Sequence, residues 1–189
     1  MSKTRLEAFS DAVIAIIMTV MVLELHVPHG LDWAALRPVV PPFITYVFSF
    51  VMLGIYWNNH HHLLHAAERV TGRVLWANLH LLFWLSLIPF VTGWMGENHF
   101  AALPTAVYGF ILLMSAVSYT LLVMAILAGE GHSSRLGRAI GRDSKGKISL
   151  ALYMAAIPLA FVHQLISDAL FVIVALIWFI PDRRIEAQH

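Results

Sequence analysis

The feature of this sequence that most limits its fold is a set of long apolar stretches. A membrane-spanning helix needs about 20 mainly apolar residues, because the hydrocarbon core of a bilayer is about 30 Å thick. Six stretches are candidates, at about residues 9–27, 41–61, 74–94, 103–128, 148–162 and 165–180. We therefore predict an all-α membrane protein in which residues 1–189 form a single six-helix transmembrane domain.

The last two spans come from one apolar run, residues 148–180. As a single helix this run would be a rod of about 50 Å, well beyond the thickness of the hydrocarbon core. We predict two crossings with a turn near His163, Gln164 and Asp168. One long tilted helix is the alternative.

Composition agrees with a membrane protein and excludes several other classes. Hydrophobic residue types make up 59% of the chain and charged types 12%, where a soluble domain has about 25% charged residues. The polar residues are too few to coat a soluble domain of this size, which disfavours soluble enzymes and disordered chains. A net charge of +1 gives no bias toward nucleic acid, and zero cysteines exclude disulfides and thiolate metal sites.

The basic residues predict the orientation of the spans, since Lys and Arg collect in short loops on the cytoplasmic side. Six crossings place all but one of the 12 basic residues on one side of the membrane. Arg37 is the exception. The others are Lys3, Arg5, Arg69, Arg73, Arg135, Arg138, Arg142, Lys145, Lys147, Arg183 and Arg184. An odd number of spans would split this set, so we predict six crossings with both termini in the cytoplasm.

The first span has polar residues at its start and an apolar stripe along its length. Glu7 and Asp11 suit the positive end of the helix dipole, and Asp11 needs a donor from Arg5, from Ser10 or from a neighbouring helix. Six positions fall within an arc of about 100°: Ala12, Ile16, Thr19, Val20, Leu23 and Val27. Such a stripe packs helices together, or it forms a dewetting constriction when repeated around a symmetry axis. Glu24 lies at the outer end of this span, where it could attract cations or simply sit at the interface.

Histidines gather at the end of the second span, at His60, His61, His62 and His65. His61 and His65 are one helical turn apart, so structural hydrogen bonding, metal binding and proton sensing all remain open. His80 lies deeper, and we expect it to bond a neighbouring helix, with the polar start of the first span as one candidate. The usual hydrolase, metalloprotease and nucleotide-binding motifs are absent, so an enzyme would have to depend on these histidines.

The segment Arg5-x-x-x-Phe9-Ser10-Asp11, at the start of the first of six spans, resembles the signature of the transmembrane protein 175 family. The continuation through residues 12–28 and the His-rich end of the second span are similar to prokaryotic members. The resemblance implies a homotetrameric potassium channel whose first helices line a central pore. It implies a constriction at Ile16, completed by Thr19 or by Val20 and Leu23. It also gives Arg5, Ser10 and Asp11 a role in structure and gating, with His80 as a partner.

We therefore predict a multi-pass, potassium-permeable cation channel of a prokaryotic inner (plasma) membrane, which conducts passively. Its expected partners are other copies of the chain, the lipid bilayer and monovalent cations, with no cofactor, no bound metal and no nucleic acid. Three alternatives remain open. They are a proton-coupled or metal-ion transporter that uses the histidine cluster, a membrane-embedded enzyme, and a non-conducting assembly subunit.

Overall fold

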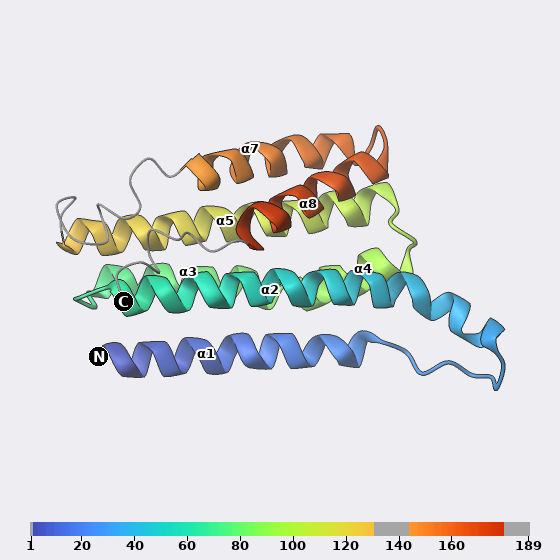
Figure 1. The fold of residues 1–189 in the computed structure, drawn as a ribbon, viewed down its shortest axis with the longest axis horizontal. Helices are drawn as coiled ribbons and strands as arrows, with labels where there is room; N and C mark the ends of the chain where they lie inside the picture. Colours follow the sequence, from blue (N-terminus) through green and yellow to red (C-terminus); the bar gives the residue numbers. More distant parts are fainter. Residues whose placement is uncertain (1, 131–143, 180–189) are drawn as a thin grey trace.

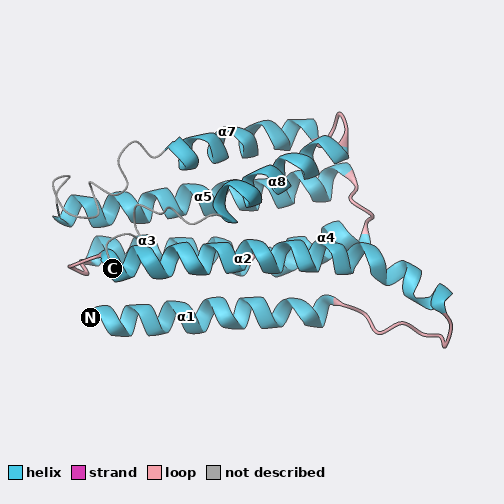
Figure 2. Ribbon diagram, in the orientation of Figure 1, coloured by secondary structure: helices cyan, strands magenta, loops and turns pink. Residues whose placement is uncertain are grey.

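The computed structural model describes residues 2–130 and 144–179, and no β-strand occurs in these two ranges. The helices lie side by side along one common direction (Figure 1), and loops join them within each of the two described ranges (Figure 2). In chain order they are α1 (Lys3–Val20), η1 (Met21–Glu24), η2 (Trp33–Val39), α2 (Val40–Ala66), α3 (Gly72–Ser86), α4 (Ile88–Glu97), α5 (Ala102–Glu130), α7 (Ser144–Leu159) and α8 (Gln164–Phe179). The predicted all-helical class is confirmed for the described residues.

Within the described residues, four helical segments are long and apolar enough to cross a membrane: Lys3–Glu24, Trp33–Ala66, Gly72–Glu97 and Ala102–Glu130. They correspond to the first four predicted spans. The remaining two spans correspond to α7 and α8, which have 16 residues each and would be about 24 Å long. The chain turns between them, so the alternative of one long tilted helix is wrong. The prediction that Asp168 lies near the turn is wrong, because this residue lies inside α8.

Two predicted spans differ in detail from the structure. The first stops being helical at Glu24, so Val27 lies beyond it in a loop, next to Pro28. The third is two helices, α3 and α4, which meet at Leu87. Pro89 explains the interruption, because proline lacks a backbone N–H and its ring crowds the preceding turn of a helix. Proline is tolerated in the first turn, where it stands in α4.

One end of the bundle carries most of the described basic residues. Figure 1 shows that α1 begins, α2 ends, α3 begins and α5 ends there. The Lys3 ammonium donates to the carbonyl of His65, and the Glu130 carboxylate accepts the backbone N–H groups of Glu68 and Arg69. Also on this side are Arg5, Arg73, Lys145 and Lys147, whereas Arg37 precedes α2 at the other end. The remaining predicted members of the set, Arg135, Arg138, Arg142, Arg183 and Arg184, lie outside the described residues.

A buried polar network and a close backbone approach fix α4 against α2. The Thr92 hydroxyl donates to the Ser49 hydroxyl over 2.7 Å, and Ser49 shares a 2.8 Å hydrogen bond with the hydroxyl of Tyr108 on α5. Near the C-terminal end of α4, a Cβ atom on Gly96 would lie 2.5 Å from Oγ1 of Thr45 on α2, so only glycine fits where the two helices cross. These contacts hold α2, α4 and α5 together, and α1 packs mainly on one of them, α2.

Candidate functional site

Helix α1 has one face that packs on the rest of the chain. Leu6, Ser10, Ile14 and Ile17 are buried, and their spacing of three or four residues places them along one side of the helix. They contact α2 and α3, with a few contacts to α4 farther along. This face attaches α1 to its own bundle.

The opposite face of α1 carries the predicted stripe and points away from the bundle. Ile16 is 61% exposed and Leu23 is 77% exposed, and Ala12, Thr19 and Val20 are exposed beside them. The Thr19 hydroxyl donates to the carbonyl of Ile16 over 2.9 Å. The described chain therefore leaves a continuous, mainly aliphatic surface on its first helix. Val27, the last member of the predicted stripe, lies beyond the helix and is no part of this face.

Ser10 joins α1 to α3 and, through α3, to α2. The Nδ2 group of Asn78 donates to the Ser10 hydroxyl over 2.9 Å, and Ser10 donates in turn to the carbonyl of Leu6. The Oδ1 atom of Asn78 lies 2.7 Å from Nε2 of His60, which donates to it. Ser10, Asn78 and His60 are all buried, so each bond is shielded from solvent. This network ties three helices together one turn into the apolar part of α1.

Asp11 receives its hydrogen bond from a neighbouring helix, which was one of the three predicted sources. The indole Nε1 of Trp57 on α2 donates to Oδ1 of Asp11 over 3.0 Å. Ser10 is engaged elsewhere, so it is not the donor. Arg5 is exposed and makes no hydrogen bond or ion pair within the described ranges, and Phe9 is also exposed. Of the four motif residues, Ser10 and Asp11 hold α1 in place.

His80 does not join this network, so that part of the prediction is wrong. Its Nε2 atom accepts from the indole of Trp84, and its Nδ1 atom donates to the Ser118 hydroxyl on α5 over 2.9 Å. His80 does bond a neighbouring helix, as expected, but that helix is α5. The reason is geometric: Asn78 and His80 are two residues apart, about 200° around α3, so they face opposite sides. Sequence reasoning missed Asn78 as the partner of Ser10, as it missed Trp57 as the donor to Asp11.

The histidine cluster divides into one buried member and three on the surface side of α2. His60 faces the network, whereas His61 and His65 stack with ring centroids 6.1 Å apart, and His62 contacts His61 edge to face. Within residues 2–130 and 144–179, no three His, Cys, Asp or Glu side chains are grouped as metal ligands. The geometry therefore gives no support to a metal site at the cluster.

Glu24 lies against its own bundle at the end of α1. Its Oε2 atom would be 3.2 Å from a Cβ atom placed on Gly93, so the carboxylate side chain rests on α4. Near this end, Nδ1 of His26 lies 3.3 Å from Oε1 of Glu97 in an exposed pair. An effect of Glu24 on cations at the outer mouth stays a prediction.

Comparisons with known proteins agree with the predicted family. Residues 5–89 match the family model described as "Endosomal/lysosomal potassium channel TMEM175". The chain is 54% identical to a protein named a potassium channel from Chryseobacterium sp. (strain P1-3), over 98% of this chain and 97% of that one. It is 31% identical to one named a potassium channel from Streptomyces collinus, over 91% of this chain and 89% of that protein.

A solved structure of a TMEM175 homolog has the same fold as this chain. The crystal structure of a lysosomal potassium-selective channel TMEM175 homolog from Chamaesiphon minutus superposes with a TM-score of 0.82 at 25% identity. The match covers 95% of this chain and 97% of that one. These relatives are channels, so the enzyme alternative is excluded by the family. The chain belongs to the TMEM175 family of ion channels.

Proposed function

We propose that this chain is the subunit of a potassium-permeable cation channel that conducts passively, with α1 of each copy lining a pore at the centre of a homotetramer. The observation that carries the proposal is the exposed aliphatic face of α1, opposite the face that packs on the bundle. Relatives named potassium channels, at 54% and 31% identity, support potassium as the permeant ion.

We call the face of α1 that points away from its own bundle the outer face. The composition of this outer face favours a helix–helix contact over a lipid contact. Ala8, Ala12 and Ala15 are all exposed there, beside the larger Ile16. Small residues let helix backbones approach closely in a membrane. Elsewhere the exposed surface carries bulky aromatic side chains, such as Phe83 on α3 and Phe90 on α4, which suit lipid. Copies of α1 could therefore meet around an axis with Ile16 directed toward it.

A constriction formed by Ile16, Val20 and Leu23, with Thr19 between them, would control conduction in two ways. An aliphatic ring too narrow for a hydrated ion excludes water, and such a neck gates by dewetting. An ion that passes has to lose part of its hydration shell, which costs sodium more than potassium because sodium is the more strongly hydrated ion. The network of Ser10, Asn78 and His60 would keep the outer face of α1 in register with the axis.

We also propose how the subunit is oriented in the membrane. The end of the bundle that carries Lys3, Arg5, Arg69 and Arg73 would face the cytoplasm. Six crossings, made by α1, α2, α3 with α4, α5, α7 and α8, would place both termini on that side of a prokaryotic inner membrane. With 16 residues each, α7 and α8 would be the two shortest crossings.

The test is potassium flux from proteoliposomes that contain the purified chain. We expect flux down a potassium gradient alone, and we expect Ile16→Asn to increase it while reducing the preference for potassium over sodium, because an amide wets the neck. Ile173→Asn is the matched control, since Ile173 is an exposed isoleucine on α8, far from the proposed pore. Equal flux in both variants and in the unchanged protein would remove Ile16 from the constriction.

A further inference from the structure

The connection between α1 and α2, residues 25–39, projects from the end of the bundle opposite the basic end. Figure 1 shows that it continues beyond α1 and extends past the ends of α4 and α5. The helical stretch Trp33–Ala66 that includes its second half has 34 residues and would be about 50 Å long. The hydrocarbon core of a bilayer is about 30 Å thick, so part of this stretch lies outside it.

Two carboxylates mark where the hydrocarbon ends on this side. Glu24 is the last residue of η1 and Glu97 is the last residue of α4. Pro42 lies at the same level, because a Cβ atom on Gly96 would lie 2.6 Å from the Cα atom of Pro42. A carboxylate is costly in hydrocarbon, so the end of the apolar layer lies close to these residues. The α1–α2 connection therefore lies at or beyond this boundary, where lipid chains cannot cover it.

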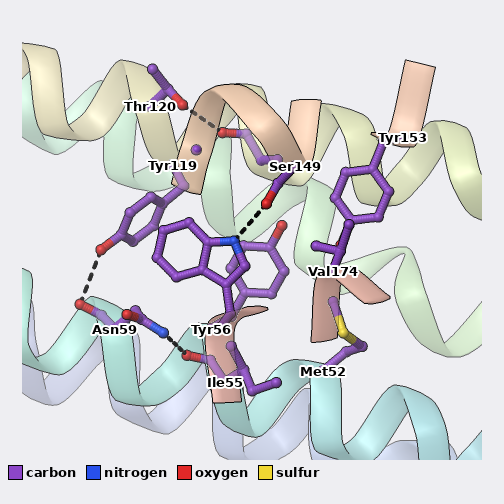
Figure 3. A pocket seen from close by; sticks show the side chains of 12 residues that line it. Met52, Ile55, Tyr56, Asn59, Tyr119, Thr120, Ser149, Tyr153 and Val174 are labelled. Atoms are coloured by element: carbon purple, nitrogen blue, oxygen red, sulfur yellow. Dashed lines mark hydrogen bonds between the residues drawn. The ribbon is translucent and has the colours of Figure 1, made fainter. Parts of the chain in front are cut away.

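The connection nevertheless carries large apolar side chains that no described residue covers. Trp33 is 87% exposed, Leu31 is fully exposed and Leu36 is exposed beside them. Figure 3 shows the contrast inside the bundle, where Met52 and Tyr153 point into one small pocket and both are buried. An exposed apolar patch outside the membrane marks a surface that binds another protein.

The local contacts give the connection a defined shape before any partner binds. The Asp32 carboxylate accepts the backbone N–H of Ala35 over 3.1 Å and so caps η2. A Cβ atom on Gly30 would lie 2.8 Å from Cβ of Ala35, so the loop folds closely onto η2. A partner would therefore meet a preformed apolar surface.

We propose that the neighbouring copies of this chain cover this surface, so that the α1–α2 connections of adjacent subunits pack on one another around the outer mouth of the pore. This inference rests on the proposed homotetramer. The connection follows directly from Leu23 on the outer face of α1, which places it next to the axis around which the copies of α1 would meet. Charge also favours a second copy. Glu24 and Arg37 lie at this end with opposite charges, and neither forms an ion pair within residues 2–130 and 144–179, so adjacent copies offer each other a complementary charge.

The first test compares two exposed tryptophans. Trp33→Ala removes the largest side chain of the connection, and Trp76→Ala is the matched control, because Trp76 is 75% exposed on α3 away from the connection. Each variant is diluted in detergent micelles, its tetramer fraction is measured by native mass spectrometry, and its helix content is checked by circular dichroism. We expect Trp33→Ala to raise the subunit concentration at which half of the protein is tetrameric by about ten-fold or more, because buried tryptophans dominate interface energies. Trp76→Ala should change it by less than about two-fold.

The second test finds what covers Trp33 in the assembled protein, which is held in lipid nanodiscs so that both membrane faces can be reached. The Trp33 signal is the difference in fluorescence between the unchanged protein and Trp33→Phe, and Trp76→Phe gives the Trp76 signal in the same way. Iodide quenches tryptophans that face water, and brominated phospholipids quench those that face lipid. We expect the Trp33 signal to resist both quenchers and the Trp76 signal to be quenched by brominated lipid.

The outcomes separate this inference from the proposed function. Quenching of Trp33 by iodide would show that the connection is uncovered, and quenching by brominated lipid would show that lipid covers it. Either result overturns the proposal, as does a Trp33→Ala tetramer that dissociates like the unchanged protein. Any of these results in a tetramer that conducts potassium removes this inference alone. An unchanged protein that is monomeric refutes the proposed homotetramer as well.

Discussion

Replacement of Asn78 by leucine should weaken the attachment of α1 to α2 and α3. Leucine has the branching and the number of side-chain heavy atoms of asparagine, although its methyl groups occupy more space, and it loses two interhelical bonds, 2.9 Å to Ser10 and 2.7 Å to His60. Interhelical hydrogen bonds in membranes contribute about 0.6 kcal/mol on average and at most about 1.7 kcal/mol each. Ser10 keeps its bond to a backbone carbonyl, but Nε2 of His60 loses its partner. We expect the free energy of unfolding to fall by about 1–3 kcal/mol.

The assay is equilibrium unfolding of Asn78→Leu in mixed micelles, with potassium flux measured on the same preparation. Asn98→Leu is the matched control, because Asn98 is exposed and its side chain bonds only the carbonyl of Trp94 one turn earlier. That substitution should stay within about 0.5 kcal/mol of the unchanged protein. If Asn78→Leu is no less stable than Asn98→Leu, the reasoning about the three-helix network is refuted.

Two further predictions concern the backbone of α4. Gly96→Ala should lower the free energy of unfolding by about 1–3 kcal/mol, since its Cβ would lie 2.5 Å from a side-chain oxygen of α2. Gly54→Ala is the control and should be neutral or stabilising, because its Cβ would meet nothing within 4 Å. Equal melting temperatures for the two variants would contradict this prediction. His99 stands just after α4 at φ 50°, in the left-handed region that favours glycine. His99→Gly should therefore leave the unfolding free energy unchanged or raise it by up to about 1 kcal/mol, and a clear loss in chemical denaturation would show that the His99 side chain has a role of its own.

The helical class and the positions of the spans could be predicted because they follow from composition and length. The turn between α7 and α8 was predictable for the same reason, since one helix there would exceed the bilayer. The interruption at Leu87 was missed although Pro89 signals it, because a proline in the first turn and a proline inside a helix look alike in a sequence. The early end of the first span was missed in the same way, although Pro28 follows Val27.

The partners of the motif were harder to predict than its presence. Trp57 and Asp11 are 46 positions apart, and Asn78 and Ser10 are 68 apart, so only the packing of α1 on α2 and α3 brings them together. Depth along the span indicates His80 as a partner for the first span, but Asn78 is the residue that bonds Ser10. The choice between them depends on how α3 is rotated about its axis, and the sequence does not state that rotation.

The outer face of α1 was predictable as a stripe, but not as a pore lining. Spacing alone places Ile16 and Leu23 on one side of a helix, and helix packing produces the same pattern. The structure adds that this side is turned away from the bundle of its own chain. The resemblance to channels then gives that exposed surface a function to be tested.

The measurement that tests this account most directly is the accessibility of single cysteines on α1. The chain has no cysteine of its own, so Leu23→Cys and Ile14→Cys each carry one thiol. Leu23 is 77% exposed on the outer face and Ile14 is fully buried on the inner face. We expect a water-soluble, positively charged thiol reagent to block potassium flux through Leu23→Cys and to leave Ile14→Cys unaffected. Flux through Leu23→Cys that persists after complete modification of its thiol would contradict a pore lined by α1.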